Sequence, residues 1–449
     1  MNEKTNGSQL QRQLKLIHVI AIGIAYMSPF AVFDTFGIAS EASGGFVPAS
    51  YILVFTAILF TALSYGKLVQ KFPISGSVYT YTRRIMNPYL GVVVGWATFL
   101  AYLALPMINA LLANIYLSSG FPNIPGFVWI IGLIALTTIL NIFGVKIAAS
   151  INILLVMFQF LVCTIFIYLN IKSINSDGTH QYITFQTLFP ADLEFSPLLA
   201  GAALLALSFI GFDAITTLSE ETIKPRKTIP KAILIVASIG GIFFFTVTYF
   251  MQSLFPNVSV FNNIDGASPE IAYIIGGNLF LSLFISGALV SVFASGLAAQ
   301  LSASRLLFAM GRDKVIPKAF FGYIHPKHKT PVPNILLIGV LALSALFLDL
   351  ELATSLINFG AFTAFSFVNL CVITMFVKSK RPRPVKYILS HFIAPSLGLF
   401  FVIYLWLNLD LVSITIGLIW TVLGIIYLAF STNFFKISPP EIKFEELDM

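Results

Sequence analysis

A series of long hydrophobic stretches fills most of this chain of 449 residues and limits what it can fold into. A helix that crosses a bilayer needs about 20 predominantly apolar residues, and about twelve stretches meet that requirement. They begin near Ile17, Pro48, Tyr89, Phe127, Ala149, Pro197, Pro230, Gly277, Val332, Ala353, His391 and Leu411. Only 10% of the residues are charged, compared with about 25% in soluble domains. The sequence therefore predicts an all-α integral membrane protein with about twelve transmembrane helices.

Basic residues alternate between the two sides of these predicted spans. With the N-terminus in the cytoplasm, all but one of the 26 Lys and Arg residues fall in cytoplasmic segments, and the exception is Lys172. The basic runs are Lys67 to Arg84, Lys224 to Lys231, Arg305 to Lys329 and Lys378 to Lys386. We interpret them as topology signals, with contact to anionic lipid as a minor addition, and expect no nucleic-acid partner. A multi-pass protein with both termini in the cytoplasm follows.

Two of the stretches carry a carboxylate and a helix-weakening residue in their interior. The first stretch contains Ser28, Pro29 and Asp34, and the sixth contains Gly211 and Asp213. Backbone leaves the helix at membrane depth only where it lines protein or water. Paired interruptions in corresponding parts of two halves are a sequence indication of a transporter's substrate site. The first and sixth helices are therefore expected to be broken.

The positions of the two interruptions predict an inverted repeat. Five spans separate the start of one copy from the start of the next, and an odd number inverts the second copy. The expected organisation is a cytoplasmic tail at 1–16, a first repeat at 17–171, an external loop at 172–196, a second repeat at 197–377, two further spans at 378–430 and a cytoplasmic tail at 431–449.

Asp34 and Asp213 are the charged residues that remain inside the predicted membrane region. Because no Lys or Arg lies near the middle of any predicted span, the pair is expected to bind a cation: an amine, a metal ion or a proton. Burial favours a protonated carboxylic acid and an approaching ammonium favours the carboxylate, so both residues are also candidates for proton coupling. The alternative is that each acid is protonated and hydrogen-bonded to a loosened turn.

Aromatic and polar residues near the interruptions add to the candidate site. Tyr26 and Tyr102 could place ring faces against a desolvated ammonium. Gly23, with Ser28 and Gly211, is expected to shape the broken helices. In the fifth predicted span, Asn152 and Gln159 have two alternative interpretations: they hydrogen-bond the unwound backbone, or they join one helix to another.

Several motifs resemble those of the amino acid, polyamine and organocation transporter superfamily. They are SFIGFDAITTLSEE in the sixth span, FPISGSVYTYTRR at 72–84, NPYLGVVVGW at 87–96, and SRLLFAMGRDKVIPKAFFGYIHPKHKTPVPN at 304–334. The first-span motif AYMSPFAVFDTFGIAS looks like that of the bacterial putrescine importer group within this superfamily. The resemblance implies a five-plus-five inverted-repeat fold, alternating access, uptake driven by the proton gradient, and a substrate site between the first and sixth spans.

The resemblance also implies roles for individual residues. Asp213 lies where related exchangers have an acid linked to substrate and proton, and Tyr102 matches the group's third-span binding tyrosine. Ser28 and Pro29 replace a Gly-Ser-Gly turn that holds an amino acid's carboxylate, which favours a diamine. Ala101, however, stands where the importer group has Asp.

A second departure concerns the proton site, because Gln159 replaces the lysine that serves this purpose in some relatives. Proton coupling would then use Asp213 or Asp34. Phe209, beside the sixth-span interruption, completes the expected substrate-binding set, which comprises Tyr26, Ser28, Asp34, Tyr102, Phe209, Gly211 and Asp213.

These observations predict a secondary transporter of a bacterial inner membrane that imports a small organic cation, with putrescine or a related amine favoured, by alternating access coupled to protons. An amino-acid permease or an amine and amino-acid exchanger is the alternative. We expect neither an enzyme nor a cofactor or metal site, because His325 and His328 belong to a predicted cytoplasmic loop. A channel fits paired broken helices less well than alternating access does.

Overall fold

The computed structural model describes residues 10–121, 123–177, 188, 195–257, 260–261, 264, 267–379, 384–409 and 411–440. Within these ranges the regular structure is helical, apart from an isolated bridge between Leu14 and Thr222. Ten described helices are long and apolar enough to cross a membrane, and a bent pair makes an eleventh span. A shorter apolar helix, Val332–Leu346, begins where the ninth predicted span begins. The prediction of an all-helical, multi-pass membrane protein is confirmed.

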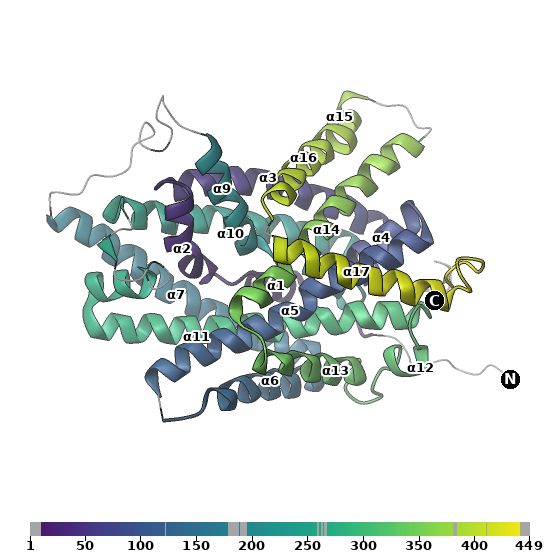
Figure 1. Cartoon of the computed structure of the whole chain (residues 1–449), viewed down its shortest axis with the longest axis horizontal. Helices are drawn as coiled ribbons and strands as arrows, with labels where there is room; N and C mark the ends of the chain where they lie inside the picture. The colour runs from purple at the N-terminus through teal and green to yellow at the C-terminus, as the bar shows by residue number, and fades with distance from the viewer. Residues whose placement is uncertain are drawn as a thin grey trace.

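Figure 1 shows the helices as one bundle. In chain order they are α1 (Leu16–Met27), α2 (Ala31–Ala42), α3 (Val47–Lys71), α4 (Ser77–Ile85), α5 (Pro88–Gly120), α6 (Gly126–Phe143), α7 (Val145–Asp177), α9 (Phe195–Leu205), η1 (Ala206–Phe209), η2 (Ala214–Glu221), α10 (Pro225–Leu254), α11 (Ala267–Arg312), α12 (Lys318–Phe321), α13 (Val332–Ala342), η4 (Leu343–Leu346), α14 (Leu350–Lys378), α15 (Val385–Ile388), η5 (Leu389–Ile393), α16 (Ala394–Leu407) and α17 (Leu411–Ser431). Most of the predicted external loop, and the tail after residue 440, lie outside the described residues.

Helix α5 forms the centre of the bundle. Its apolar window is 83% buried, whereas the windows of α6 and α17 are only 22% buried. It packs mainly against α14 and α11, while α3 packs mainly against α10. In Figure 1, α5 accordingly runs through the middle of the molecule. Side chains on α5 are therefore well placed to contribute to a central site.

The first and sixth spans are both interrupted, as the sequence predicts. Helices α1 and α2 meet at a bend of 40°, where Ser28 has a φ of 58°. In the sixth span, the backbone between η1 and η2 is not helical, and Gly211 has a φ of 127°. A Cβ atom at Gly211 would overlap the ring of Tyr26, so glycine is required here for conformation and for space. The ends of the two broken spans are therefore in direct contact.

Two basic residues expected beyond the ends of predicted spans lie within helices. Arg305, the first residue of a predicted cytoplasmic basic run, lies within α11 and is fully buried. Lys172, expected just beyond the fifth span, lies within α7. Arg305 is stable in the helix because the Glu221 carboxylate pairs with it, a contact that hydrophobicity along the chain does not reveal. The division into inverted repeats stays a prediction.

Candidate functional site

A cavity of about 320 Å³ lies beside the break in the first span. Its wall is formed by α1, α2, α5, α9, η1, α11 and α14 and is mostly apolar. Among the described residues that line the cavity, Asp34 is the only one with a charged side chain. A small concave site with few polar groups is the usual form of a small-molecule pocket.

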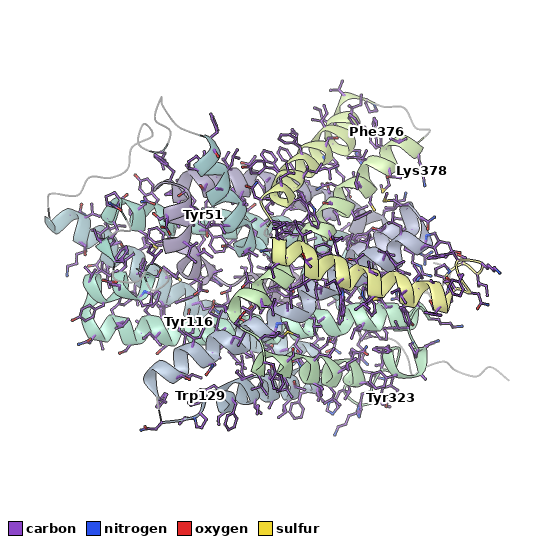
Figure 2. The ribbon with its side chains drawn as sticks, viewed as in Figure 1. Tyr51, Tyr116, Trp129, Tyr323, Phe376 and Lys378 are labelled. Atoms are coloured by element: carbon purple, nitrogen blue, oxygen red, sulfur yellow. The ribbon has the colours of Figure 1, made fainter. Side chains whose placement is uncertain are left out.

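Asp34 extends from the first turn of α2, directly after the break, into this cavity. Tyr116 donates a hydrogen bond to Asp34 Oδ1 at 2.7 Å, and no ion pair to Asp34 occurs in the described part of the chain. Figure 2 shows Tyr116 at the end of the bundle where α2 lies. The N-terminal turn of a helix stabilises a carboxylate through its partial positive charge. A negative group without a fixed counter-charge is thus available to a ligand.

Neutral oxygen atoms gather at the end of α1. The hydroxyl groups of Ser28 and Ser291 hydrogen-bond to each other, and both residues line the cavity. Ser295 donates to the backbone oxygen of Tyr26 at 3.1 Å, and Asn109 donates to the Ser295 hydroxyl at 3.1 Å. The last carbonyl groups of a helix carry partial negative charge. This part of the wall therefore also favours a cationic group.

Asp213 lies behind the cavity and is not among its lining residues. It is 5% exposed, and its carboxylate accepts hydrogen bonds from Tyr102 Oη at 2.9 Å and from the Gly211 amide at 3.2 Å. The Tyr102 ring meets the Tyr26 ring edge to face, with centroids 6.4 Å apart. Because Tyr26 lines the cavity, Asp213 connects to the cavity wall through two tyrosine rings.

The expected binding residues thus form two groups. Tyr26, Ser28 and Asp34 line the cavity, whereas Tyr102 and Asp213 lie behind it. The remaining two, Phe209 and Gly211, are also absent from the wall. Phe209 instead packs its ring against those of Tyr51, Phe55 and Phe244.

Among the described residues, the two polar residues of the fifth span form neither of the contacts expected for them. Asn152 and Gln159 are fully buried in α7. Neither side-chain amide has a hydrogen-bond partner in the part of the chain that the structure describes. Gly23 lies within α1 and packs closely against η2, since a Cβ there would crowd Ile215.

Tyr116, Asn109 and Ser291 were not predicted as site residues. A signal for the first two was present in the sequence, because Tyr102, Asn109 and Tyr116 follow one another at intervals of seven residues in a stretch whose other polar residue is Asn114. Seven residues are close to two helical turns, so the three side chains lie on one face of α5. Ser291 gave no comparable signal, since serine is common along α11.

Buried ion pairs join η2 to α11 at the other end of the broken sixth span. Arg305 contacts both oxygens of Glu221, at 2.8 and 3.0 Å, and both side chains are almost completely buried. The backbone oxygen of Glu221 also accepts hydrogen bonds from the amides of Gln13 and Leu14. The segment that precedes α1 is therefore fixed to the end of η2.

Further ion pairs lie next to the pair of Arg305 and Glu221. Arg312 pairs with Glu220 and with Asp313, and Arg83 of α4 lies 3.3 Å from Asp313. Tyr79 donates to the same Asp313 oxygen at 3.0 Å. We call Arg83, Glu220, Glu221, Arg305, Arg312 and Asp313 the ion-pair layer. It ties the end of the sixth span to α4 and α11.

The sequence is similar to those of known transporters. The sequence profile of the amino acid permease family matches residues 18–435. The chain is 42% identical over 439 residues to the low-affinity putrescine importer PlaP of Escherichia coli strain K12, covering 97% of each chain. It is 43% identical over 192 residues to a probable low-affinity putrescine importer of Klebsiella pneumoniae, covering 42% of this chain and 98% of the relative. The branched-chain amino acid permease BcaP of Bacillus subtilis strain 168 is 27% identical over 462 residues, covering 97% of this chain and 96% of the relative.

Proposed function

The chain belongs to the amino acid permease family, and from that premise we propose that it is a secondary transporter that imports putrescine or a related small amine. The observation that carries the proposal is Asp34, a carboxylate in the cavity wall that has no cationic partner in the described chain. Asp34 is exposed to the cavity, and an ammonium group would form a charge-assisted hydrogen bond with its carboxylate. The high identity to an importer of putrescine supports the same substrate class.

A diamine would use both polar parts of the cavity. One ammonium pairs with Asp34, and the second lies near the oxygens of Ser28, Ser291 and the Tyr26 backbone. An ammonium has three donors and no acceptor, so hydroxyl and carbonyl oxygens suit it. Because these oxygens carry only partial charge, the second ammonium is held less strongly than the first. This expectation agrees with a low-affinity site.

Alternating access would move the broken spans. The ion-pair layer closes one end of the sixth span, while the cavity lies beside α2 and α9 at the other end. We assign the cavity to the external side and the layer to the cytoplasmic side of a bacterial inner membrane, because this orientation places the basic runs and both termini in the cytoplasm. The division into repeats at 17–171 and 197–377 belongs to the same proposal.

Proton coupling is assigned to Asp213. Its carboxylate is buried where the two broken spans meet and accepts a hydrogen bond from Tyr102. The Tyr102 ring in turn contacts Tyr26 of the cavity wall. Protonation would remove its charge and change its bond to the Gly211 amide, and so would alter the contact between the two spans. Movement of these spans and the proton state of Asp213 would thereby depend on each other.

Uptake of labelled putrescine into proteoliposomes tests the function. We expect saturable uptake that shows counterflow and that diamines inhibit more strongly than monoamines or amino acids. If a branched-chain or other zwitterionic amino acid competes best, the chain is an amino-acid permease. A flux that does not saturate would instead indicate a channel.

The proton assignment has its own test in the same vesicles. We expect Asp213→Asn to retain putrescine counterflow but to lose the stimulation of net uptake by an inwardly directed proton gradient. If the variant keeps that stimulation, Asp213 is not the coupling residue. Asp34→Asn then serves as the comparison, since Asp34 is the remaining sequence-predicted candidate.

A further inference from the structure

A second pocket, of about 550 Å³, lies away from the cavity at the ends of α3, α4 and α14, beside α15 and η5. Three cationic side chains line it, those of Lys71, Arg84 and Lys378, together with His391. No carboxylate is among its described lining residues. We propose that this basic pocket binds the phosphate headgroup of an anionic phospholipid.

The pocket combines residues from distant parts of the sequence. Lys71 is the last residue of α3, Arg84 lies in the last turn of α4, and Lys378 is the last residue of α14. His391 comes from η5, a π-helical turn of a kind that is frequent at functional sites. Figure 2 shows Lys378 at the end of α14, near α15. Two basic runs that the sequence presents as separate topology signals therefore meet in one place.

Several of these groups are held in position. Lys378 donates to the Ile85 backbone oxygen at 2.8 Å, which fixes its ammonium at the pocket wall. The His391 ring stacks on Tyr387 with centroids 4.1 Å apart. One turn before Lys71, the Lys67 nitrogen is buried and has no hydrogen-bond partner in the described chain. A phosphate oxygen accepts charge-assisted hydrogen bonds from ammonium groups, so Lys71 and Lys378 would bind one phosphate together.

The surroundings favour a lipid over a free phosphate ion. Leu63, Lys67 and Lys71 follow at intervals of four residues, so this face of α3 changes from apolar to basic toward its end. Leu63 is 39% exposed, and Phe392 and Ile393, next to His391, are 42% and 41% exposed. A headgroup in the pocket would leave its acyl chains against these apolar side chains. Basic pockets between transmembrane helices on the cytoplasmic side bind anionic headgroups in this manner.

Binding of lipid to the purified full-length protein tests the proposal. Native mass spectrometry with phosphatidylglycerol, phosphatidylcholine and inorganic phosphate gives a dissociation constant for each. We expect phosphatidylglycerol to bind most tightly, and Lys71→Gln with Lys378→Gln to weaken it about 25-fold, or about fivefold for each lysine. The matched control is Lys227→Gln with Lys231→Gln, which removes two exposed charges from α10 outside the pocket and should change binding less than twofold.

Four results would overturn the proposal. Equal weakening in the control pair would indicate general attraction of lipid to basic residues. Equal affinity for phosphatidylcholine would exclude recognition of charge, and inorganic phosphate binding as tightly as the lipid would exclude a role for the acyl chains. Truncation after Pro440 that tightens lipid binding more than tenfold would show that the acidic tail occupies the pocket instead. Unchanged melting temperatures of the variants exclude misfolding as the cause.

Discussion

Asp34 and Glu221 are both carboxylates within the bundle, but their surroundings differ. Glu221 is 1% exposed and receives two hydrogen bonds from the Arg305 guanidinium. Asp34 faces a cavity and receives one hydrogen bond from the neutral Tyr116 hydroxyl. Glu221 joins η2 to α11, two elements of the protein itself. Asp34 has no cationic partner in the described chain, so a cation from solution could complete an ion pair with it.

This difference shows how to distinguish a charged residue that stabilises the fold from one that binds a ligand. Moving a charge out of water is costly, and a fixed partner with good geometry offsets that cost within the folded protein. Without a fixed partner, the carboxylate gains most from a cation that arrives from solution. Hydrophobicity and depth in the membrane do not distinguish the two cases. The presence or absence of a fixed cationic partner does. The following predictions test this distinction, beginning with the largest expected effect.

Breaking the buried pair should affect stability most. Arg305→Met leaves the Glu221 carboxylate buried without its partner, so we expect a loss of about 3–5 kcal/mol in the free energy of unfolding. Thermal unfolding of the purified protein in detergent measures the change. The double variant Arg305→Met with Glu221→Leu removes both charges and should recover most of the loss. If it is no more stable than the single variant, the ion pair is not the source of the effect.

Removing the unpaired carboxylate should affect binding instead. Asp34→Asn keeps the shape of the side chain and the Tyr116 contact but loses the charge. Removing one partner of a close charge pair costs about 2–5 kcal/mol of binding free energy. We expect the KM for putrescine uptake to rise at least 30-fold, with little change in melting temperature. A fall in stability comparable to that of Arg305→Met, at unchanged KM, would make Asp34 a structural charge and remove the distinction.

The hydrogen bond that holds Asp34 can be removed separately. Tyr116→Phe deletes the donor to Asp34, and a hydrogen bond to a charged group contributes about 1.5–3 kcal/mol. We expect the KM for putrescine to rise about tenfold or more, with a smaller change in the maximum rate. The matched variant is Tyr102→Phe, which deletes the donor to Asp213 and should alter the response to a proton gradient more than the KM. Indistinguishable phenotypes would show that the two acids do not have separate roles.

The smallest effect is expected at the neutral end of the cavity. Ser291→Ala removes a hydroxyl near Ser28, and an uncharged hydrogen bond contributes about 0.5–1.5 kcal/mol. We expect inhibition constants for diamines to rise about twofold to tenfold, while those for monoamines, which use Asp34 alone, stay the same. Competition against labelled putrescine measures both. An equal change for the two classes would contradict the two-point binding of diamines.

Much of the fold was predictable because it depends on local chemistry. α3, α5 and α6 begin one residue before the predicted starts at Pro48, Tyr89 and Phe127. Apolar runs of spanning length have no stable alternative to a helix in a bilayer. The breaks were predictable for a similar reason, since Pro29 and Gly211 weaken a helix wherever it packs.

The candidate site was only partly predictable. Both acids were identified from the cost of charge at membrane depth, yet the structure places Asp34 in the cavity wall and Asp213 behind it. The burial of Arg305 was not predictable, because it depends on Glu221, which is 84 residues away in the sequence. Tyr116 is 82 residues from Asp34, and the two basic runs of the second pocket are farther apart still.

The sequence by itself determined that the chain crosses a membrane many times, that two spans break, and that acidic groups remain at depth. These properties follow from transfer free energies and backbone conformations, which each residue carries into any fold. The tertiary structure alone decided which acid faces a cavity, which is paired with arginine, and which lysines share a pocket. Such partnerships depend on how each helix is rotated and packed against its neighbours, and side chains distant along the chain meet only when the bundle is assembled.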